Sequence, residues 1–248
     1  MCGRYATARS RQELLDAFDV EVDETWGEDG EDLLRADYNA APTKLLPAIL
    51  ERADPEAAEE TVPVRRLRML RWGLVPSWAK DPSIGNRMIN ARVETAAEKP
   101  SFRRAFAKRR CLLPADGYYE WYTGKDEKTG RPKKQPFFIT PKDHGILSLA
   151  GLYELWKDPD GDWLWTFTIL TTQAVDAVGH IHDRMPMTVT DEDAWLDPSL
   201  KDPQSLLVPA MSGELEAFPV PKAVGNVRNN GPSLIRPLEP EGGEEALF

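Results

Sequence analysis

The sequence has few of the side chains that build disulfide frameworks and metal centres. Its 248 residues include two cysteines, Cys2 and Cys111, and three histidines. Two cysteines make at most one disulfide, and structural zinc sites draw on clustered cysteine and histidine ligands. We therefore expect a protein of a reducing compartment that uses no metal and no cofactor. Cys111 stands in the apolar run "RRCLLPA" and is expected to be a buried thiol.

Long hydrophobic runs are also missing. No stretch approaches the ~18 apolar residues of a membrane-spanning helix, and no apolar segment of the signal-peptide kind opens the chain. We expect a cytoplasmic protein with no membrane partner, and a monomer by default. The length suffices for one large hydrophobic core.

Positive charge is scarce overall but concentrated in one segment. The formal net charge is −10, which by itself argues against a nucleic acid partner. Residues 63–134, however, hold 18 Lys and Arg against 7 Asp and Glu, whereas the remainder holds 13 against 34. This asymmetry predicts one basic face on an acidic body, as in proteins that bind nucleic acids.

Helices are expected near the edges of the fold. Ser10 and Glu13 form a capping-box pattern, which predicts a helix from Ser10 to Phe18. Ser101 is expected to cap a second helix over "FRRAFAKRR", with Phe102 and Phe106 one turn apart on its buried face. Short helices are predicted at "DEDAWL" and "DPQSLL".

Strand-like segments dominate the middle of the chain. They are "TKLLPAILER", "RLRMLRWGLVP", "CLLPA", "GYYEWY", "PFFIT", "ILSLAGLYELW" and "WLWTFTIL". The polar stretch "TGKDEKTGRPKKQ" is expected to connect a hairpin. We predict a single α+β domain with a largely antiparallel, barrel-like β core and peripheral helices. The domain should span residues 1–236, and an acidic, disordered tail should occupy residues 237–248.

The opening "MCGRYA" places a cysteine directly after the initiator methionine. Removal of Met1 would leave Cys2 with a free α-amine and a thiol on adjacent carbons. Their ordinary pKa values, about 7.7–8.0 and about 8.5, leave both groups nucleophilic near neutral pH. An aldehyde can form an imine with such an amine, after which the thiol closes a five-membered thiazolidine ring. No internal residue offers this pair of groups.

Two further residues are candidates for acid and base catalysis. Glu120 lies inside the aromatic strand "GYYEWY" and either points to solvent or is buried, where desolvation would raise its pKa. His180 and His182 in "GHIHDRMPM" would share a face on a strand, but no cluster completes a zinc site there. His182 is the better acid–base candidate, and His144 is expected in a turn.

Two tryptophans flank a Gly and a Pro in "RWGLVPSWAK". Trp72 is expected to be a core residue. Trp78 stands beside Lys80 and is a candidate for an exposed stacking residue, since aromatic and basic side chains together bind single-stranded nucleic acid.

These motifs together resemble the SOS response-associated peptidase (SRAP) family, whose members covalently capture abasic sites in single-stranded DNA. The resemblance rests on an ordered set of segments that runs from residue 1 to residue 231. They are "MCGRYA", "YNAAPT", "RWGLVPSWAK", "INARVETAAEKPSFRRAF", "CLLPADGYYEW", "KKQPFFI", "TILTT", "HIHDRMP" and "AVGNVRNNG".

The resemblance implies a role for each matching residue. Cys2 would be the nucleophile that joins the ring-opened sugar as a thiazolidine, and Asn90 would hold the cysteine and the sugar. Glu120 would move protons during sugar ring opening and imine formation, and His182 would serve as acid and base, including in reversal. The partner would be single-stranded DNA with an abasic site. Its contacts would come from Arg4, Pro42, Trp78, Arg92 and Thr171.

Three other interpretations remain open from the residues. Class II glutamine amidotransferases also begin Met-Cys-Gly, although their arginine-glycine and Asn-Gly-Glu elements do not stand at a suitable spacing here. A thiol peptidase could combine Cys2, Glu120 and His182, with removal of Met1 as its simplest reaction. A module that only binds single strands would explain the charge asymmetry but gives Cys2 no role.

Overall fold

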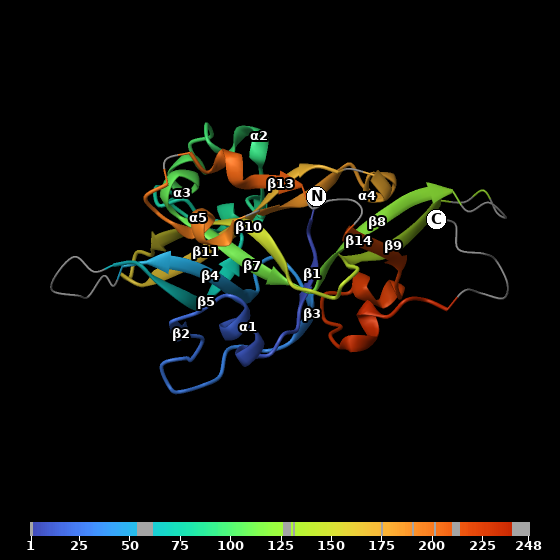
Figure 1. Ribbon diagram of the computed structural model, residues 1–248, viewed down its shortest axis with the longest axis horizontal. Coiled ribbons are helices and arrows are strands. Elements are labelled where there is room, and N and C mark those ends of the chain that lie inside the picture. The colour runs from blue at the N-terminus through green and yellow to red at the C-terminus, as the bar shows by residue number, and fades with distance from the viewer. Residues whose placement is uncertain are drawn as a thin grey trace.

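The computed structural model describes most of the chain, namely residues 2–53, 62–125, 130, 132–174, 176–189, 191–200, 202–209 and 214–239. Its strands form two sheets, which we call sheet A and sheet B. Sheet A extends to one side of the ring that sheet B makes (Figure 1).

Five strands of sheet B form a closed ring. The order β10–β7–β4–β5–β11 closes on itself because β11 also pairs with β10. The β11–β5 pairing is parallel and the other four are antiparallel. The expected barrel-like, largely antiparallel core is therefore confirmed. The ring strands are β4 (Leu45–Arg52), β5 (Val64–Trp72), β7 (Arg110–Ala115), β10 (Leu147–Lys157) and β11 (Trp163–Gln173).

Shorter strands extend sheet B at its margins. The strand β12 pairs antiparallel with both β10 and β11, and β6 runs parallel to β11. These two strands bring the "HDRMP" and "NAR" segments to the same region of the ring. The added strands are β2 (Val22–Glu24), β6 (Asn90–Arg92), β12 (Arg184–Val189) and β13 (Leu207–Pro209).

Sheet A is antiparallel throughout, in the order β14–β9–β8–β1–β3. Asp116 alone separates β7 of the ring from β8, and its carboxylate accepts from Ala8 N at 2.6 Å and Arg9 Nε at 2.7 Å. This anchor fixes the N-terminal strand beside β8. The strands are β1 (Tyr5–Thr7), β3 (Asp37–Ala40), β8 (Gly117–Lys125), β9 (Pro132–Pro141) and β14 (Leu215–Pro219).

Helices and 3₁₀ turns lie around the two sheets (Figure 1). Most of them are short, and they lie at the margins of the sheets. The helices are α1 (Arg11–Ala17), α2 (Val93–Ala96), α3 (Arg103–Lys108), α4 (Asp176–Ile181) and α5 (Glu192–Leu196). The 3₁₀ turns are η1 (Pro82–Arg87), η2 (Pro203–Leu206), η4 (Lys222–Gly225) and η5 (Pro232–Ile235).

The two predicted helix caps have different outcomes. The capping box of Ser10 and Glu13 is present at the start of α1, as expected. The cap assigned to Ser101 is wrong, because α3 begins at Arg103 after Phe102 and has no side-chain cap. The carbonyl oxygen of Lys99 accepts from the N–H groups of Phe102 and Arg103, each at 2.9 Å, so the preceding turn already satisfies these donors.

Three buried clusters hold the fold together. The first fills the ring and continues to one face of sheet A, and it contains Cys2, Trp72 and Cys111. Both expectations for the latter two residues are confirmed, since each is fully buried. The second cluster lies outside the ring, under α1, α3 and α5. The third lies between the other face of sheet A and the C-terminal 3₁₀ turns.

Several predicted segments fall partly outside the described residues. These are the middle of the β8–β9 connection and the tail beyond residue 239, so the tail boundary stays a prediction. Met1 also lies outside them, and its removal stays a prediction. No helix in the described ranges is long and apolar enough to cross a membrane.

Candidate active site

Cys2 is fully buried in the first cluster, at the point where the ring meets sheet A. The Asn90 side chain donates from Nδ2 to the carbonyl oxygen of Cys2 at 2.8 Å. Asn90 reaches this position because β6 pairs with β11, where Asn90 lies opposite Ile169. The Cys2 thiol points its proton at the carbonyl oxygen of Arg4, 3.9 Å away. Backbone and side-chain contacts thus fix the second residue of the chain.

Glu120 takes the inward of its two possible orientations. It is only 3% exposed, and on β8 it shares a face with Tyr118, two residues earlier. Burial raises the pKa of Glu120, and the nearby His182 acts in the opposite direction. A carboxyl group with a raised pKa keeps its proton closer to neutral pH, where it can act as a general acid.

His182 lies next to Glu120, with 4.0 Å between His182 Nε2 and Glu120 Oε2. Its Nδ1 accepts from the backbone N–H of Arg184 at 3.0 Å and lies 3.0 Å from the Asp183 carboxylate. The Arg184 N–H suits the neutral tautomer with its proton on Nε2, which faces Glu120, whereas the Asp183 carboxylate suits a proton on Nδ1. The pair can therefore pass a proton between carboxyl group and imidazole.

The expectation that His180 and His182 share a strand face is wrong. The helix α4 ends at Ile181, and β12 begins only at Arg184, so His180 stands on an exposed helix end. His144, expected in a turn, lies in one with a φ of 58°. Within the described residues, no group of three or more Cys, His, Asp and Glu could hold a metal ion.

Burial raises the pKa of the Cys2 thiol, and the Glu120 carboxylate raises it further. The resting sulphur is therefore a neutral thiol. A reaction at this sulphur needs a base that removes its proton, and Glu120 is the carboxylate that acts on it electrostatically. Cys2, Glu120 and His182 form one chain of electrostatically coupled groups.

The arginine and threonine candidates for DNA contact occupy different environments. Arg4 is half-buried, and its Nη1 donates to Asn39 Oδ1 at 2.7 Å and to the carbonyl oxygen of Val224 at 2.8 Å. Arg92 is exposed at the end of β6. Thr171 is buried on β11, opposite Arg92 in the parallel pairing. Arg92 is thus the more accessible of the two cations.

Pro42 and Trp78 lie in loops on the surface. Pro42 is half-buried in the turn before β4. Trp78 is 57% exposed, as expected of a stacking residue. The loop that carries it is anchored by Trp156, whose Nε1 donates to the carbonyl oxygen of Ala79 at 2.7 Å.

Asn39 is a site residue that the sequence analysis missed. It is fully buried, and its Nδ2 donates to the carbonyl oxygens of Val224, Asn226 and Asn229 at 2.9–3.3 Å. With its Oδ1 it also holds Arg4. A buried amide with four hydrogen bonds joins β3 to the C-terminal loop. The segment "YNAAPT" was a usable signal, because asparagine is rarely buried without such a role.

Arg184 was also missed as a site residue. Its guanidinium binds both carboxylate oxygens of Glu94, at 2.6 and 3.0 Å, and the backbone oxygen of Thr171. It therefore joins α2 to β11 beside His182. In the sequence it stands two residues after His182, but its partner Glu94 is 90 residues away.

Many of the basic side chains predicted for one face instead form ion pairs and hydrogen bonds within the fold. Arg65 pairs with Glu51 and Asp193, while Arg66 and Arg68 share Glu24. Arg110 is buried and donates to backbone carbonyl oxygens. The exposed cations of the segment include Lys80, Arg87, Arg92, Lys99, Arg103, Arg104 and Lys108.

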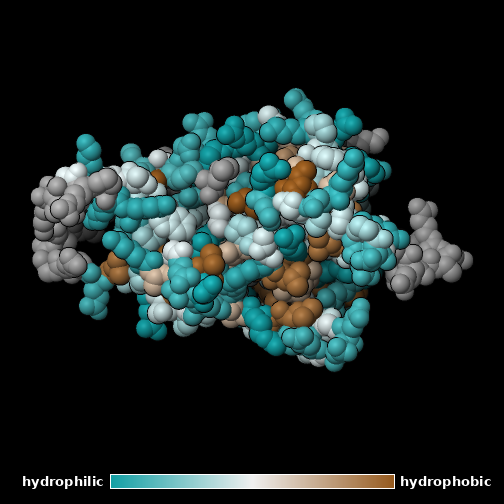
Figure 2. Space-filling view, turned by 180° about the vertical axis from the view of Figure 1, so that it is seen from behind, coloured by the Kyte–Doolittle hydropathy of each residue, from teal (hydrophilic) through white to brown (hydrophobic). Residues whose placement is uncertain are grey.

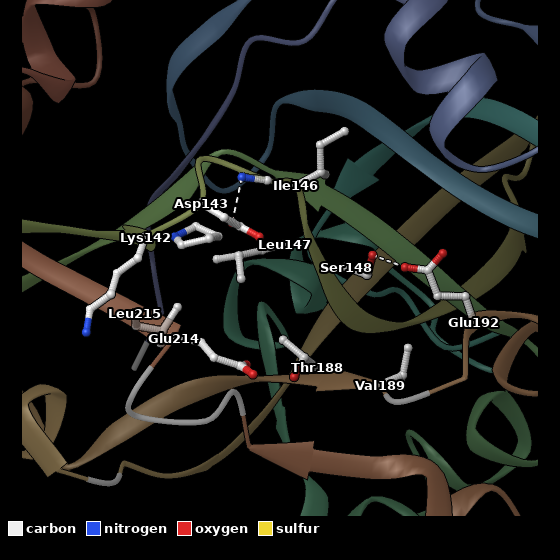
Figure 3. Close-up of a pocket in the computed structure, with 12 residues that line it drawn as sticks. Lys142, Asp143, Ile146, Leu147, Ser148, Thr188, Val189, Glu192, Glu214 and Leu215 are labelled. Carbon is white, nitrogen blue, oxygen red and sulfur yellow. Dashed lines mark hydrogen bonds between the residues drawn. The ribbon is translucent and has the colours of Figure 1, made fainter.

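A cavity of about 520 Å³ lies away from this chemistry, between β9, β10, β12 and β14. Figure 3 shows Ser148 donating to Glu192 on one side of it and Lys142 and Glu214 on the other. None of Cys2, Asn90, Glu120 and His182 lines it. The reactive groups are therefore gathered at Cys2 and not in this cavity.

The fold and the site define a class of protein. A mixed β barrel with an attached antiparallel sheet buries a cysteine at position 2, held by an asparagine and coupled to a carboxyl–imidazole pair. The chain belongs to the family described as SOS response associated peptidase (SRAP), whose sequence profile matches residues 1–227. The resemblance expected from the motifs is confirmed.

Similar proteins come from bacteria and animals. The chain is 40% identical over 240 residues to the abasic site processing protein YoqW of Bacillus subtilis (strain 168), covering 95% of this chain and 99% of that protein. It is 32% identical over 234 residues to the abasic site processing protein HMCES of Mus musculus, covering 82% of this chain and 65% of that protein.

The fold is also found in solved structures. A crystal structure of a protein from Bacteroides thetaiotaomicron superposes with a TM-score of 0.78 at 26% identity, covering 96% of this chain and all of that one. A crystal structure of a protein from Bordetella bronchiseptica gives a TM-score of 0.67 at 25% identity, covering 89% of this chain. The predicted fold class is therefore confirmed.

Proposed function

We propose that this protein binds single-stranded DNA in the cytoplasm and captures abasic sites covalently through Cys2. The product is a thiazolidine crosslink that shields the lesion during the DNA damage response. Relatives named abasic site processing proteins support this assignment. The proposed substrate is the ring-opened sugar of an abasic site, which carries an aldehyde.

One observation carries the proposal. Asn90, Glu120 and His182 come from three separate segments. Asn90 donates to Cys2 at 2.8 Å, His182 lies 4.0 Å from Glu120, and Glu120 acts electrostatically on the Cys2 thiol. To form a thiazolidine, this set of residues needs in addition the free α-amine of Cys2. Burial of Cys2 favours a target as small as a sugar without its base.

The chemistry divides among these residues. The Cys2 amine adds to the aldehyde carbon, and loss of water leaves a carbon–nitrogen double bond. The protonated Glu120 supplies the proton that the departing water needs, and His182 returns it. The thiol then adds to the same carbon while its proton passes to the nitrogen, which closes the ring. Asn90 holds the Cys2 carbonyl, and therefore the amine, in place.

Removal of Met1 is a required earlier step of this proposal. The Cys2 amine exists only when the peptide bond to Met1 has been cleaved. Either an aminopeptidase or the thiol chemistry of this protein performs that cleavage. The family description as a peptidase is compatible with self-processing. Membership in this family, rather than in the amidotransferases, weighs against glutamine hydrolysis.

The test is an intact-mass experiment with protein whose Met1 is confirmed absent. The protein is mixed with a short single-stranded oligonucleotide that contains one abasic site and is then denatured without a reductant. We expect an adduct that survives denaturation and needs the abasic site. Survival separates a thiazolidine from an imine, which hydrolyses.

The variants Cys2→Ala and Cys111→Ala form a matched pair. Both thiols are fully buried in the same cluster, but only Cys2 contacts Asn90. We expect Cys2→Ala to abolish the adduct and Cys111→Ala to retain it. An unchanged adduct in Cys2→Ala, or none in the wild type, would overturn the proposal.

A further inference from the structure

Two tyrosine hydroxyl groups in the first cluster are buried without a hydrogen-bond partner. The side chains of Tyr5 and Tyr118 are 0% and 1% exposed, and neither hydroxyl has a partner among the described residues. Buried hydroxyl groups in folded proteins are almost always paired. Two unpaired hydroxyl groups in one cluster therefore suggest that they bind a ligand or a group that takes part in the reaction.

The two tyrosines are neighbours by strand pairing. Tyr5 on β1 lies directly opposite Tyr118 on β8, so their side chains stand on the same face of sheet A. Glu120, two residues beyond Tyr118, shares that face. Cys2 belongs to the same buried cluster. The two tyrosines thus share a sheet face with Glu120 and a buried cluster with Cys2.

The Tyr5 ring is held in place by other aromatic rings. Its centroid is 5.3 Å from that of Trp72, which in turn stacks on Phe167 at 6.0 Å. All three side chains are fully buried. Because dense packing leaves such a ring little freedom to swing, the position of its hydroxyl oxygen is fixed.

The Cys2 sulphur is a suitable acceptor. Its proton is directed at the carbonyl oxygen of Arg4, which leaves the sulphur lone pairs for other donors. Burial raises the pKa of Tyr5 and of Tyr118, and a negative charge on Cys2 is the next contribution to both. Both phenols therefore keep their protons and lie within electrostatic reach of the sulphur.

We propose that the hydroxyl groups of Tyr5 and Tyr118 donate hydrogen bonds to the Cys2 sulphur as it becomes a thiolate and attacks the imine. This inference rests on the thiazolidine chemistry proposed above. In that step the thiol proton leaves the sulphur, a carbon–sulphur bond forms, and the double-bond electron pair moves to nitrogen, which gains a proton. Fixed donors aimed at developing charge stabilise it most in a site without water.

Other charged or titratable groups also act on this sulphur and these hydroxyls. Glu120 faces Cys2 and Tyr118, and Asp37 of β3 and Cys111 of β7 act on Tyr5. Asp37 is already held by Lys44 at 2.6 Å. Each of these is an anion when ionised, and an ionised group opposes the charge of a thiolate and has no proton to donate. Tyr5 and Tyr118 can donate one.

The experiment measures imine formation and ring closure separately. Wild type, Tyr5→Phe, Tyr118→Phe and the double variant are mixed with the abasic oligonucleotide from pH 6 to 9. One half of each sample is denatured directly, which scores the closed ring, and the other half is first treated with borohydride, which also traps the imine. We expect ring closure to slow about tenfold per hydroxyl removed. We expect total trapped adduct to stay unchanged and the rise of the closure rate with pH to shift to higher pH.

Tyr119→Phe is the matched control. Tyr119 is the next residue on β8, but it faces the third cluster, and its hydroxyl donates to the carbonyl oxygen of Tyr38 at 2.6 Å. Loss of this satisfied hydrogen bond should lower the melting temperature and leave ring closure and its pH profile unchanged. Tyr5→Phe and Tyr118→Phe should instead keep or raise the melting temperature, because each removes a buried hydroxyl that has no partner.

The possible results separate the two proposals. Absence of a stable adduct in wild type would overturn the proposed function. A wild-type adduct with unchanged closure rates in the Phe variants would overturn only the role of the hydroxyls. An equal loss of trapped imine and closed ring would also overturn it, since that pattern indicates a structural defect. If the double variant does not fold, the single variants decide.

Discussion

At the scale of single residues, Glu120 is a side chain that the fold places unfavourably for a negative charge. It is nearly fully buried beside the thiol of Cys2, and burial raises its pKa. Functional sites often hold groups in such costly environments, because a shifted pKa suits proton transfer at neutral pH. The raised pKa of Glu120 also predicts how the stability of the fold depends on pH.

We expect Glu120→Gln to stabilise the protein at neutral pH. A carboxyl group with a raised folded-state pKa contributes stability that is fully present below its unfolded pKa and is lost as pH rises through its folded pKa. Glutamine has no charge to bury. The melting temperature of Glu120→Gln should therefore exceed that of wild type at pH 7–8, and the difference should shrink toward pH 4.

Thermal unfolding at several pH values measures this difference in melting temperature. Crosslinking of the same variant measures how much activity the substitution removes. We expect adduct formation in Glu120→Gln to be slow at every pH, since glutamine cannot transfer a proton. A lower melting temperature than wild type at neutral pH would show that ionised Glu120 is stabilised by its surroundings, against the expected direction.

At the scale of elements, two glycines let the loop that carries Trp78 fold back on the ring. Gly73 follows β5 with a φ of 123°, and Gly85 lies within η1. A Cβ atom added to Gly85 would lie 2.5 Å from the carbonyl oxygen of Gly73. The two backbones touch, so neither position has room for a side chain.

We expect Gly85→Ala to lower the free energy of unfolding by about 1–3 kcal/mol, the usual cost of forcing extra atoms into a packed site. It should also weaken binding of single-stranded DNA, because η1 and the Trp78 loop must move. Gly225→Ala is the control, since nothing lies within 4 Å of its added Cβ. Denaturant unfolding that ranks the two variants equally would contradict this account.

At the scale of the whole molecule, an acidic protein presents exposed cations in the segment that carries Asn90. The net charge is −10, yet Arg87 and Arg92 are exposed close in sequence to Asn90. On the face shown in Figure 2, hydrophilic side chains cover most of the surface. Binding to DNA would therefore depend on a local group of cations rather than on the overall charge.

We expect the affinity for single-stranded DNA to fall as salt rises, and Arg92→Ala to reduce the salt slope by about 0.7, the value for one phosphate contact on a single strand. Arg68→Ala is the matched control, because Arg68 pairs with Glu24 at 2.8 Å. Its loss should leave the slope unchanged. Fluorescence anisotropy at several salt concentrations provides the measurement, and equal slopes for Arg92→Ala and wild type would refute the contact.

Local patterns in the sequence were sufficient for much of the fold. The capping box of Ser10 and Glu13 predicts α1 because both hydrogen-bonding partners lie within one turn. The apolar runs of β7 and β10 predict strands buried on both faces, and the alternation of Arg with apolar residues in β5 predicts a strand with one buried face. The residues gathered at Cys2 were also named from sequence motifs, although their mutual distances were not.

Only the tertiary structure decided where the polar side chains point and which charges pair. Glu120 has aromatic residues on both sides, so alternation alone does not indicate its buried face; the pairing of β8 with β1 does. The sequence predicts Arg65 and Arg68 on a basic surface. Their acidic partners lie 14 to 128 residues away along the chain, so local sequence does not indicate these ion pairs. Local sequence fixes the available groups and elements, whereas contacts between distant segments arise only when the sheets close.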